Sequence, residues 1–178
     1  SKGPDMAPSA TERDESFTRF VTGASPGLMR TAWLLTGSDD TARELVQATL
    51  VKAYVHWPRI RSDSALAYCR RILVNERTDR LRRLGRELPV AEPALVPARG
   101  MGADGGPGLV DERDEVVRLL KRLPEQQRRI VVLRYYCDLS EEAVADTLGI
   151  SVGTVKSSAS RALAALRGHL VAAEGGIR

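Results

Sequence analysis

Residues 139–167 read LSEEAVADTLGISVGTVKSSASRALAALR, and this stretch decides how the chain folds. Ser140 can cap a first helix, because its hydroxyl can accept a backbone N–H and two acidic residues follow it at the positive helix end. Gly149 can end that helix in a left-handed conformation, and Ser151 can cap a second helix. The pattern therefore predicts a helix-turn-helix.

The second helix of this motif has two chemically different faces. We expect its buried face to carry Val155, Ala159, Ala162 and Leu166. Its other face carries small or basic side chains, namely Thr154, Lys156, Ser157, Ser158, Ser160 and Arg161. Because no acidic residue occurs between 152 and 170, this face suits the major groove of DNA. An ordinary helical bundle is the alternative interpretation.

The composition agrees with a nucleic-acid partner without proving one. The chain has 178 residues and a formal net charge of +4, which is long enough for two small domains and favours a polyanion. Residues 61–83 contain seven arginines against three acids, so this segment alone has a charge of 7 − 3 = +4. The alternative for such a run is a solvated helix face.

No pattern of a metal, cofactor or catalytic site is present in the sequence. Cys69 and Cys137 lie far apart outside any CxxC pair, and His56 and His169 are isolated. There is no glycine-rich phosphate loop and no nucleophile with a partner histidine, so we expect no catalytic residue and no enzyme. With no signal peptide and no long apolar run, we expect a cytoplasmic protein without a membrane span.

Helical periodicity extends over nearly the whole chain, and it predicts an all-α protein of two small helical domains. The first is expected over residues 12–84 and the second over residues 110–172. Residues 85–109 contain four prolines and six glycines, a composition that is typical of a flexible linker.

Glycine and proline divide the first domain into four predicted helices. We expect Gly23 to end the first helix and Pro26 to begin a second one that stops at Gly37. Ser38 then caps a third helix that reaches about Trp57. The core contacts of the fourth helix, from about residue 64 to its end at Gly85, are expected to be Leu66, Cys69, Ile72, Leu73 and Leu84.

In the second domain, two helices are expected before the helix-turn-helix. The first spans residues 110–123. The second spans residues 124–136 and begins with Pro124 at its first position, where a missing N–H costs nothing.

Three blocks in this order resemble the sigma-70 family of bacterial RNA polymerase sigma factors, specifically its extracytoplasmic-function (ECF, group IV) members. They are DDTARELVQATLVKAYVHWPRI (39–60), SALAYCRRILVNERTDRLRR (64–83) and LPEQQRRIVVLRYYCDLSEEAVADTLGISVGTVKSSASRALAALR (123–167). The resemblance implies a region 2 domain and a region 4 domain. It also implies a factor that binds core RNA polymerase and directs promoter-specific transcription initiation.

The first block resembles conserved region 2.2, which in the family docks on the β′ clamp coiled coil of the polymerase. The resemblance implies that the polymerase-binding residues are Asp39, Asp40, Glu44, Val46 and Gln47. Ala48 stands where the family usually has an acid, and Leu50 stands where Phe is common, so one polar contact to the polymerase is expected to be missing. A second implied contact is with the β flap.

The second block resembles regions 2.3 and 2.4, which in the family capture the melted −10 element. Such capture needs a pocket for a flipped base and cations that follow the backbone. The loop at 58–64 is placed for the pocket. The implied −10 DNA-binding residues are Arg61, Ser62, Asp63, Arg70, Arg71, Asn75, Arg77, Arg80, Arg82 and Arg83.

The third block resembles region 4, which reads the −35 element as duplex DNA. The implied −35 DNA-binding residues are Thr154, Lys156, Ser157, Ser160 and Arg161. The family often has arginine at position 158. We therefore expect Ser158→Arg to strengthen binding to −35 duplex DNA and to steepen its salt dependence.

Two further hypotheses concern partners. The resemblance implies an anti-sigma factor that masks both domains, around which a flexible 85–109 segment would let them close. The alternative function is a stand-alone regulator that dimerises on DNA through the helix-turn-helix. Residues 39–83 argue against it, because such a regulator needs neither the acidic block nor the arginine-rich helix.

Overall fold

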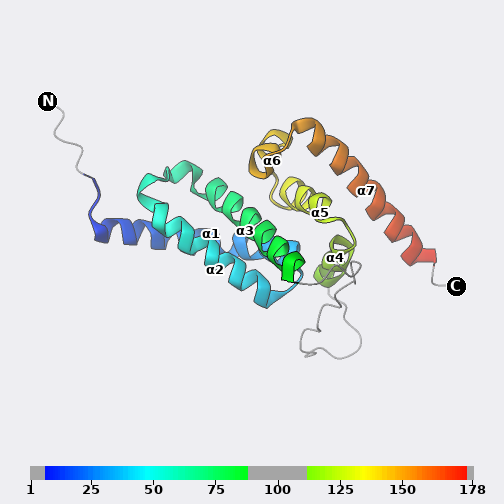
Figure 1. Cartoon of the computed structure of the whole chain (residues 1–178), viewed down its shortest axis with the longest axis horizontal. Helices are drawn as coiled ribbons and strands as arrows, with labels where there is room; N and C mark the ends of the chain where they lie inside the picture. The colour runs from blue at the N-terminus through cyan, green and yellow to red at the C-terminus, as the bar shows by residue number, and fades with distance from the viewer. Residues whose placement is uncertain (1–6, 88–111, 176–178) are drawn as a thin grey trace.

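The computed structural model describes residues 7–87 and 112–175, and within these two ranges the chain forms helices and no strand. Figure 1 shows helices α1–α3 packed together at one end of the molecule and α4–α7 at the other. The prediction of an all-α chain with two helical bundles is confirmed. Most of the predicted linker lies outside the described residues.

The first bundle contains three long helices and two short turns of 3₁₀-helix between the second and the third. They are α1 (Ala10–Thr36), α2 (Asp39–His56), η1 (Trp57–Arg59), η2 (Ser62–Ser64) and α3 (Ala65–Glu87). The second bundle is built from shorter elements before its long last helix. They are α4 (Glu112–Lys121), α5 (Glu125–Val131), η3 (Val132–Tyr136), α6 (Glu141–Leu148) and α7 (Val152–Gly175).

Helix α1 corrects the prediction of two helices in its place. It continues through Gly23 and Pro26 without a break and ends at Gly37, which has the left-handed φ of 66°. A proline inside a helix removes one hydrogen bond and costs about 3 kcal/mol. We attribute the continuity to packing, because the apolar face of α1 lies against α2 along much of its length.

Four aromatic rings hold the first half of α1 against the end of α2. Phe17 lies 5.2 Å from both Tyr54 and Trp57 between ring centroids, and Phe20 lies 5.1 Å from Trp57. Trp57 also donates its indole N–H to the hydroxyl of Ser16 at 2.8 Å. This cluster fixes the point at which α2 turns into the loop before α3.

Helix α2 is capped by Ser38 as predicted, but α3 differs from its prediction in two ways. It passes through Gly85 and ends at Glu87. Leu66 and Leu84 are 37% and 53% exposed, so their assignment to the core is wrong. Cys69 and Leu73 are fully buried as expected.

The helix-turn-helix forms as predicted, with Ser140 and Ser151 accepting the capping N–H bonds. Gly149 ends α6 with a φ of 67°. The helix expected over 124–136 is instead divided, because Pro124 lies one position before the helix and the last turn widens into the π-helix η3. The i→i+5 bond of that turn joins the Cys137 N–H to the Val132 carbonyl at 3.0 Å.

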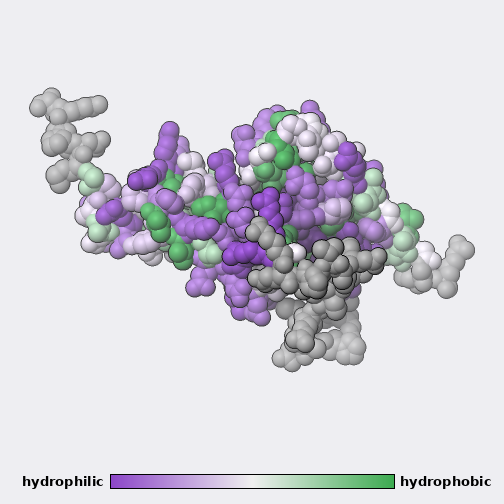
Figure 2. All heavy atoms as spheres, viewed as in Figure 1, coloured by the Kyte–Doolittle hydropathy of each residue, from purple (hydrophilic) through white to green (hydrophobic). Residues whose placement is uncertain are grey.

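The two bundles are in direct contact. Helix α1 lies against α4 and η3, α3 lies against α6, and the buried residues of both bundles form one continuous apolar cluster. Hydrophilic side chains cover most of the face seen in Figure 2. Among the described residues, no helix is long and apolar enough to cross a membrane, and no cluster of potential metal ligands is found.

Candidate nucleic-acid and polymerase interfaces

The outward face of α7 is open to solvent over its first three turns. All five predicted −35 residues are exposed, and they are Thr154, Lys156, Ser157, Ser160 and Arg161. The inward side of the helix carries Val155 and Ala162, both fully buried. Lys156 lies 3.9 Å from Glu141, too far for a strong hydrogen bond, so its ammonium remains available to another anion.

Ser158 does not belong to that outward face. It is 6% exposed and lies three residues after Val155 and four before Ala162, which places it on the inward side of the helix. The premise of the Ser158→Arg expectation is therefore wrong. An arginine there would enter the packed side of α7 before it could reach a phosphate.

A pocket opens where the loop after α2 meets the start of α3. Its volume is about 450 Å³, and its lining includes His56, Arg61 and Tyr68. Arg61 is held by a 3.3 Å hydrogen bond from its Nη2 to Asp63. An aromatic ring next to guanidinium groups can stack a base and neutralise its phosphate.

The pocket continues along one face of α3. At 100° per residue, the side chains at i, i+4, i+7 and i+11 share a side of the helix. Ser64, Tyr68 and Arg71 line the pocket with this spacing, and the exposed Asn75 and Arg82 extend the line. We call these five residues the pocket stripe.

Four of the predicted −10 arginines lie away from the pocket stripe: Arg83 is exposed on another side of α3, and the other three lie in a cavity or in ion pairs. Arg70 lines a different cavity of about 180 Å³ between α1, α3 and the end of η3. Arg77 donates its Nε to Glu125 in the second bundle at 3.4 Å, and its side chain is 13% exposed. The structure therefore does not gather the predicted −10 residues on one surface.

Arg80 also lies away from the pocket stripe, and it forms ion pairs within the first bundle. It donates to the carboxylate and the carbonyl of Glu44 at 3.3 and 3.4 Å, and it lies 4.0 Å from Glu76. Glu76 is 7% exposed and also pairs with Lys52 of α2. These ion pairs fasten α3 to α2.

The exposed side of α2 carries a row of polar and then apolar residues. Asp40, Glu44 and Gln47 are exposed, and the row continues through Val51 and Val55, which are 59% and 67% exposed. Two large exposed valines beside acidic groups are typical of a protein-binding surface.

Val46, by contrast, is 5% exposed and packs in the core, so it does not lie on the exposed row as the prediction requires. Asp39 is half-buried and lines a cavity near α4. Of the five predicted polymerase-binding residues, Asp40, Glu44 and Gln47 lie on the exposed row.

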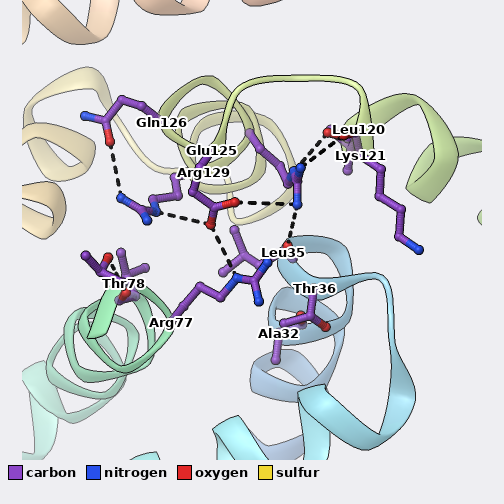
Figure 3. A network of polar contacts seen from close by, with 12 residues as sticks. Ala32, Leu35, Thr36, Arg77, Thr78, Leu120, Lys121, Glu125, Gln126 and Arg129 are labelled. Atoms are coloured by element: carbon purple, nitrogen blue, oxygen red, sulfur yellow. Dashed lines mark hydrogen bonds and ion pairs between the residues drawn. The ribbon is translucent and has the colours of Figure 1, made fainter. Parts of the chain in front are cut away.

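A buried polar network joins the two bundles, as Figure 3 shows. Glu125 of α5 accepts from Arg77 at 3.4 Å, and it also pairs with Arg128 at 3.5 Å and Arg129 at 3.4 Å. All three guanidinium groups are at most 13% exposed, so the carboxylate neutralises cations that water reaches poorly.

Arg128 satisfies carbonyl groups at the ends of two helices. It donates to Leu120, Lys121 and Leu123 around the end of α4, and to Leu35 at the end of α1 at 3.1 Å. Desolvation by burial lowers the pKa of this guanidinium. The carbonyl of Leu35 would otherwise be an unpaired group at a helix end.

Sequence reasoning missed three kinds of residue in these sites. Tyr68 could have been found, since it lies at i+4 from the predicted loop residue Ser64. The exposed valines of α2 gave a weaker signal. The contact between Glu125 and Arg77 gave no local signal, because the two residues lie 48 positions apart in the chain.

Comparison with known proteins assigns the chain to a family. Residues 20–87 match the model of Sigma-70 region 2, and residues 113–166 match that of Sigma-70, region 4. The chain is 37% identical over 157 residues to the RNA polymerase sigma-E factor of Streptomyces coelicolor, covering 88% of this chain and 86% of that protein. It is 35% identical to the ECF sigma factor SigD of Mycobacterium tuberculosis H37Rv, covering 76% of this chain and 64% of that protein.

A solved structure agrees with these matches. The sigma factor RpoE of Bartonella quintana, crystallised with the anti-sigma factor NepR, is 29% identical, with a TM-score of 0.69 over 88% of this chain and 97% of that chain. The protein described here therefore belongs to the sigma-70 family, within its ECF group. Sigma factors are transcription initiation factors and not enzymes. They bind core RNA polymerase and promoter DNA.

Proposed function

We propose that the outward face of α7 reads −35 duplex DNA and that the pocket stripe of α3 holds the melted −10 strand. The observation that carries this proposal is the exposure of all five candidate residues on α7, with the apolar side of that helix buried beneath them. A helix with this placement can enter the major groove of DNA while the rest of its domain stays folded.

For the −10 element, we keep only those predicted residues that lie at the pocket or on the pocket stripe. The pocket offers Tyr68 for stacking and Arg61 and Arg71 for phosphate, and Asn75 and Arg82 continue the track along α3. Arg70, Arg77 and Arg80 are left out, because each lies in another cavity or in an ion pair, and Arg83 is left out because it lies outside the pocket stripe.

For the polymerase, we propose the exposed row on α2 from Asp40 to Val55 as the surface that docks on the β′ clamp. Beside this row lies a hollow of about 440 Å³ lined by Glu44, Gln47 and Ala48 among others. Ala48 is the position at which the family usually has an acid, so the short side chain contributes to the hollow.

We also propose an anti-sigma factor as a regulatory partner and the cytoplasm as the location. The support is the structural likeness to the Bartonella sigma factor, whose solved structure is a complex with its anti-sigma factor. The cytoplasm is where bacterial polymerase and promoters meet.

The experiment is run-off transcription of fragmented source DNA by core RNA polymerase, with and without the protein, followed by sequencing of the 5′ ends. We expect discrete new start sites that share −35 and −10 elements. If no new start appears although the protein binds duplex DNA alone, the stand-alone regulator is the better description.

A matched pair of variants sharpens this experiment. Arg71→Gln changes the pocket stripe, and Arg83→Gln changes an exposed arginine on the same helix outside that stripe. Arg71→Gln is expected to reduce initiation roughly tenfold, and Arg83→Gln is expected to reduce it less. Equal effects would contradict the pocket stripe as the −10 site.

A further inference from the structure

An acidic side chain of α6 lies beside the candidate DNA face of α7. Glu141 is the first residue of α6, and its carboxylate lies 3.9 Å from the ammonium of Lys156, one of the five candidate −35 residues. Helix α7 itself contains no acid before Glu174. The first helix of the helix-turn-helix therefore brings to this face a negative charge that the second helix lacks there.

The packing of the two helices places these charges side by side. Helix α6 lies against the start of α7 (Figure 1), and Val144 of α6 and Val155 of α7 are both fully buried. Glu141 lies about one helical turn before Val144, and Lys156 directly follows Val155. The buried side of the motif therefore holds the carboxylate next to the lysine.

The carboxylate oxygen that faces Lys156 is buried. Oε2 of Glu141 is almost inaccessible to water and has no hydrogen-bond partner among the described residues, although the side chain as a whole is 34% exposed. Water and salt therefore screen its charge less than that of a fully exposed acid. In the two described ranges, Lys156 is the one basic group that forms an ion pair with it. The electrostatic effect of Glu141 therefore falls mainly on this lysine.

The ion pair is weak enough for DNA to break. At 3.9 Å the two groups are too far apart for a strong hydrogen bond, and the Lys156 side chain is 65% exposed. Breaking the pair still has a cost, because Lys156 loses its attraction to Glu141 when it turns to a phosphate. A phosphate that approaches Lys156 also meets the like charge of Glu141. At about 4 Å in water, one interaction between unit charges changes a binding constant about fivefold.

We propose that Glu141 lowers the affinity of α7 for duplex DNA by competing with phosphate for Lys156. This inference rests on the proposed function, in which α7 reads the −35 element. Glu141 acts through Lys156, so it is a positioning residue and touches no base. Because phosphate contacts carry no sequence information, the competition weakens binding to random DNA as much as binding to the −35 element. It limits how tightly the free protein is held on DNA outside promoters.

The competition also changes the salt dependence of binding. Each full phosphate contact adds about 0.9 to the steepness of log affinity against log salt, because a counterion leaves the DNA. Lys156 divides its time between Glu141 and phosphate, so it contributes less than one full contact. Removal of the carboxylate should steepen the slope by up to about 0.9. A purely structural role of Glu141 at the start of α6 would affect helix stability and would not steepen this slope.

The experiment measures the affinity of the full chain for two duplexes of equal length by fluorescence anisotropy at several salt concentrations. One duplex carries the −35 sequence shared by the mapped start sites, and the other has a random sequence. We expect Glu141→Gln to bind both duplexes about fivefold more tightly than the wild type, with a steeper salt slope. Wild-type affinity and slope in this variant would refute the competition.

Glu142→Gln is the matched control. Glu142 is the next residue in the first turn of α6, and it is exposed and forms no ion pair within the described part of the chain. Its substitution changes the net charge and the interaction with the helix dipole as Glu141→Gln does. We expect its affinity for both duplexes to stay within about twofold of the wild type. Equal gains in the two variants would show an effect of net charge and refute the role of the Lys156 pair.

The variant Lys156→Gln tests whether the effect passes through this lysine. When Glu141→Gln is added to Lys156→Gln, we expect the affinity to change by less than about twofold, because the cation for which Glu141 competes is gone. A fivefold gain that persists without Lys156 would overturn the assignment to this pair.

Failure of the proposed function has a different signature. If the wild type binds the −35 duplex no more tightly than the random duplex, α7 does not read the −35 element. If the wild type prefers the −35 duplex and Glu141→Gln gains nothing over Glu142→Gln, the competition alone is refuted.

Discussion

The basic side chains of helices α3 and α7 differ in their exposure and in their ion pairs. On α7, Lys156 and Arg161 are exposed, and among the described residues this face forms one ion pair, the long one of 3.9 Å between Lys156 and Glu141. On α3, Arg77 and Arg80 are 13% and 26% exposed and pair with carboxylates of other helices. A cation on a helix is therefore available to DNA only when no acid from elsewhere in the fold holds it at hydrogen-bonding distance.

The largest expected effect tests a cation that belongs wholly to the fold. Arg128→Met would leave the carbonyls of Leu35, Leu120, Lys121 and Leu123 without their donor. We expect a loss of about 3 kcal/mol in the free energy of unfolding, since each buried unpaired acceptor is costly. Urea unfolding measures this, and a loss below about 1 kcal/mol would show that the carbonyls find other donors.

Ser158→Arg tests the inward side of α7. Because Ser158 is 6% exposed, a larger and charged side chain there should destabilise region 4 by about 2 kcal/mol. The midpoint of thermal unfolding measures the loss, and the matched variant Ser157→Arg, on the exposed face, should show almost none. A stable Ser158→Arg protein with tighter −35 binding would restore the original expectation.

Arg161→Gln tests the free surface. We expect about a tenfold loss of affinity for −35 duplex DNA at moderate salt, and a shallower dependence of log affinity on log salt, because one phosphate contact is lost. The free energy of unfolding should change by less than about 0.5 kcal/mol, as is usual for an exposed side chain. Titration by fluorescence anisotropy at several salt concentrations measures the first effect.

The smallest expected effect separates two arginines of α3. Arg80→Gln should lower the free energy of unfolding by about 1 kcal/mol, because Arg80 is paired with Glu44 and Glu76. Arg82→Gln should leave stability unchanged and weaken binding to single-stranded −10 DNA about threefold. The reverse pattern would mean that the ion pairs are not maintained in solution.

Much of the fold follows from local sequence. Ser140, Gly149 and Ser151 determine where the helix-turn-helix begins, turns and continues, because caps act within a few residues. The same holds for Ser38 at the start of α2. The local signals for helix ends failed at Gly23, Pro26 and Gly85, which all lie inside continuous helices.

The candidate sites divide in the same way. The outward face of α7 could be predicted, because the spacing of the apolar residues identifies the buried side of the helix and so the side opposite to it. Ser158 was nevertheless placed on the wrong side. For the arginine-rich helix α3, the sequence could not predict which side is exposed, because charged residues occur on all sides of the helix.

The sequence by itself determined the helices, their caps, the family and the outward face of α7, since these depend on residue types at short spacings. The tertiary structure alone decided which arginines are free. Arg77 and Arg80 are set apart from Arg71 and Arg82 by Glu125 and Glu44, which lie on other helices. Electrostatic partners depend on distances in space, and residues 48 positions apart along the chain carry no local sign of them.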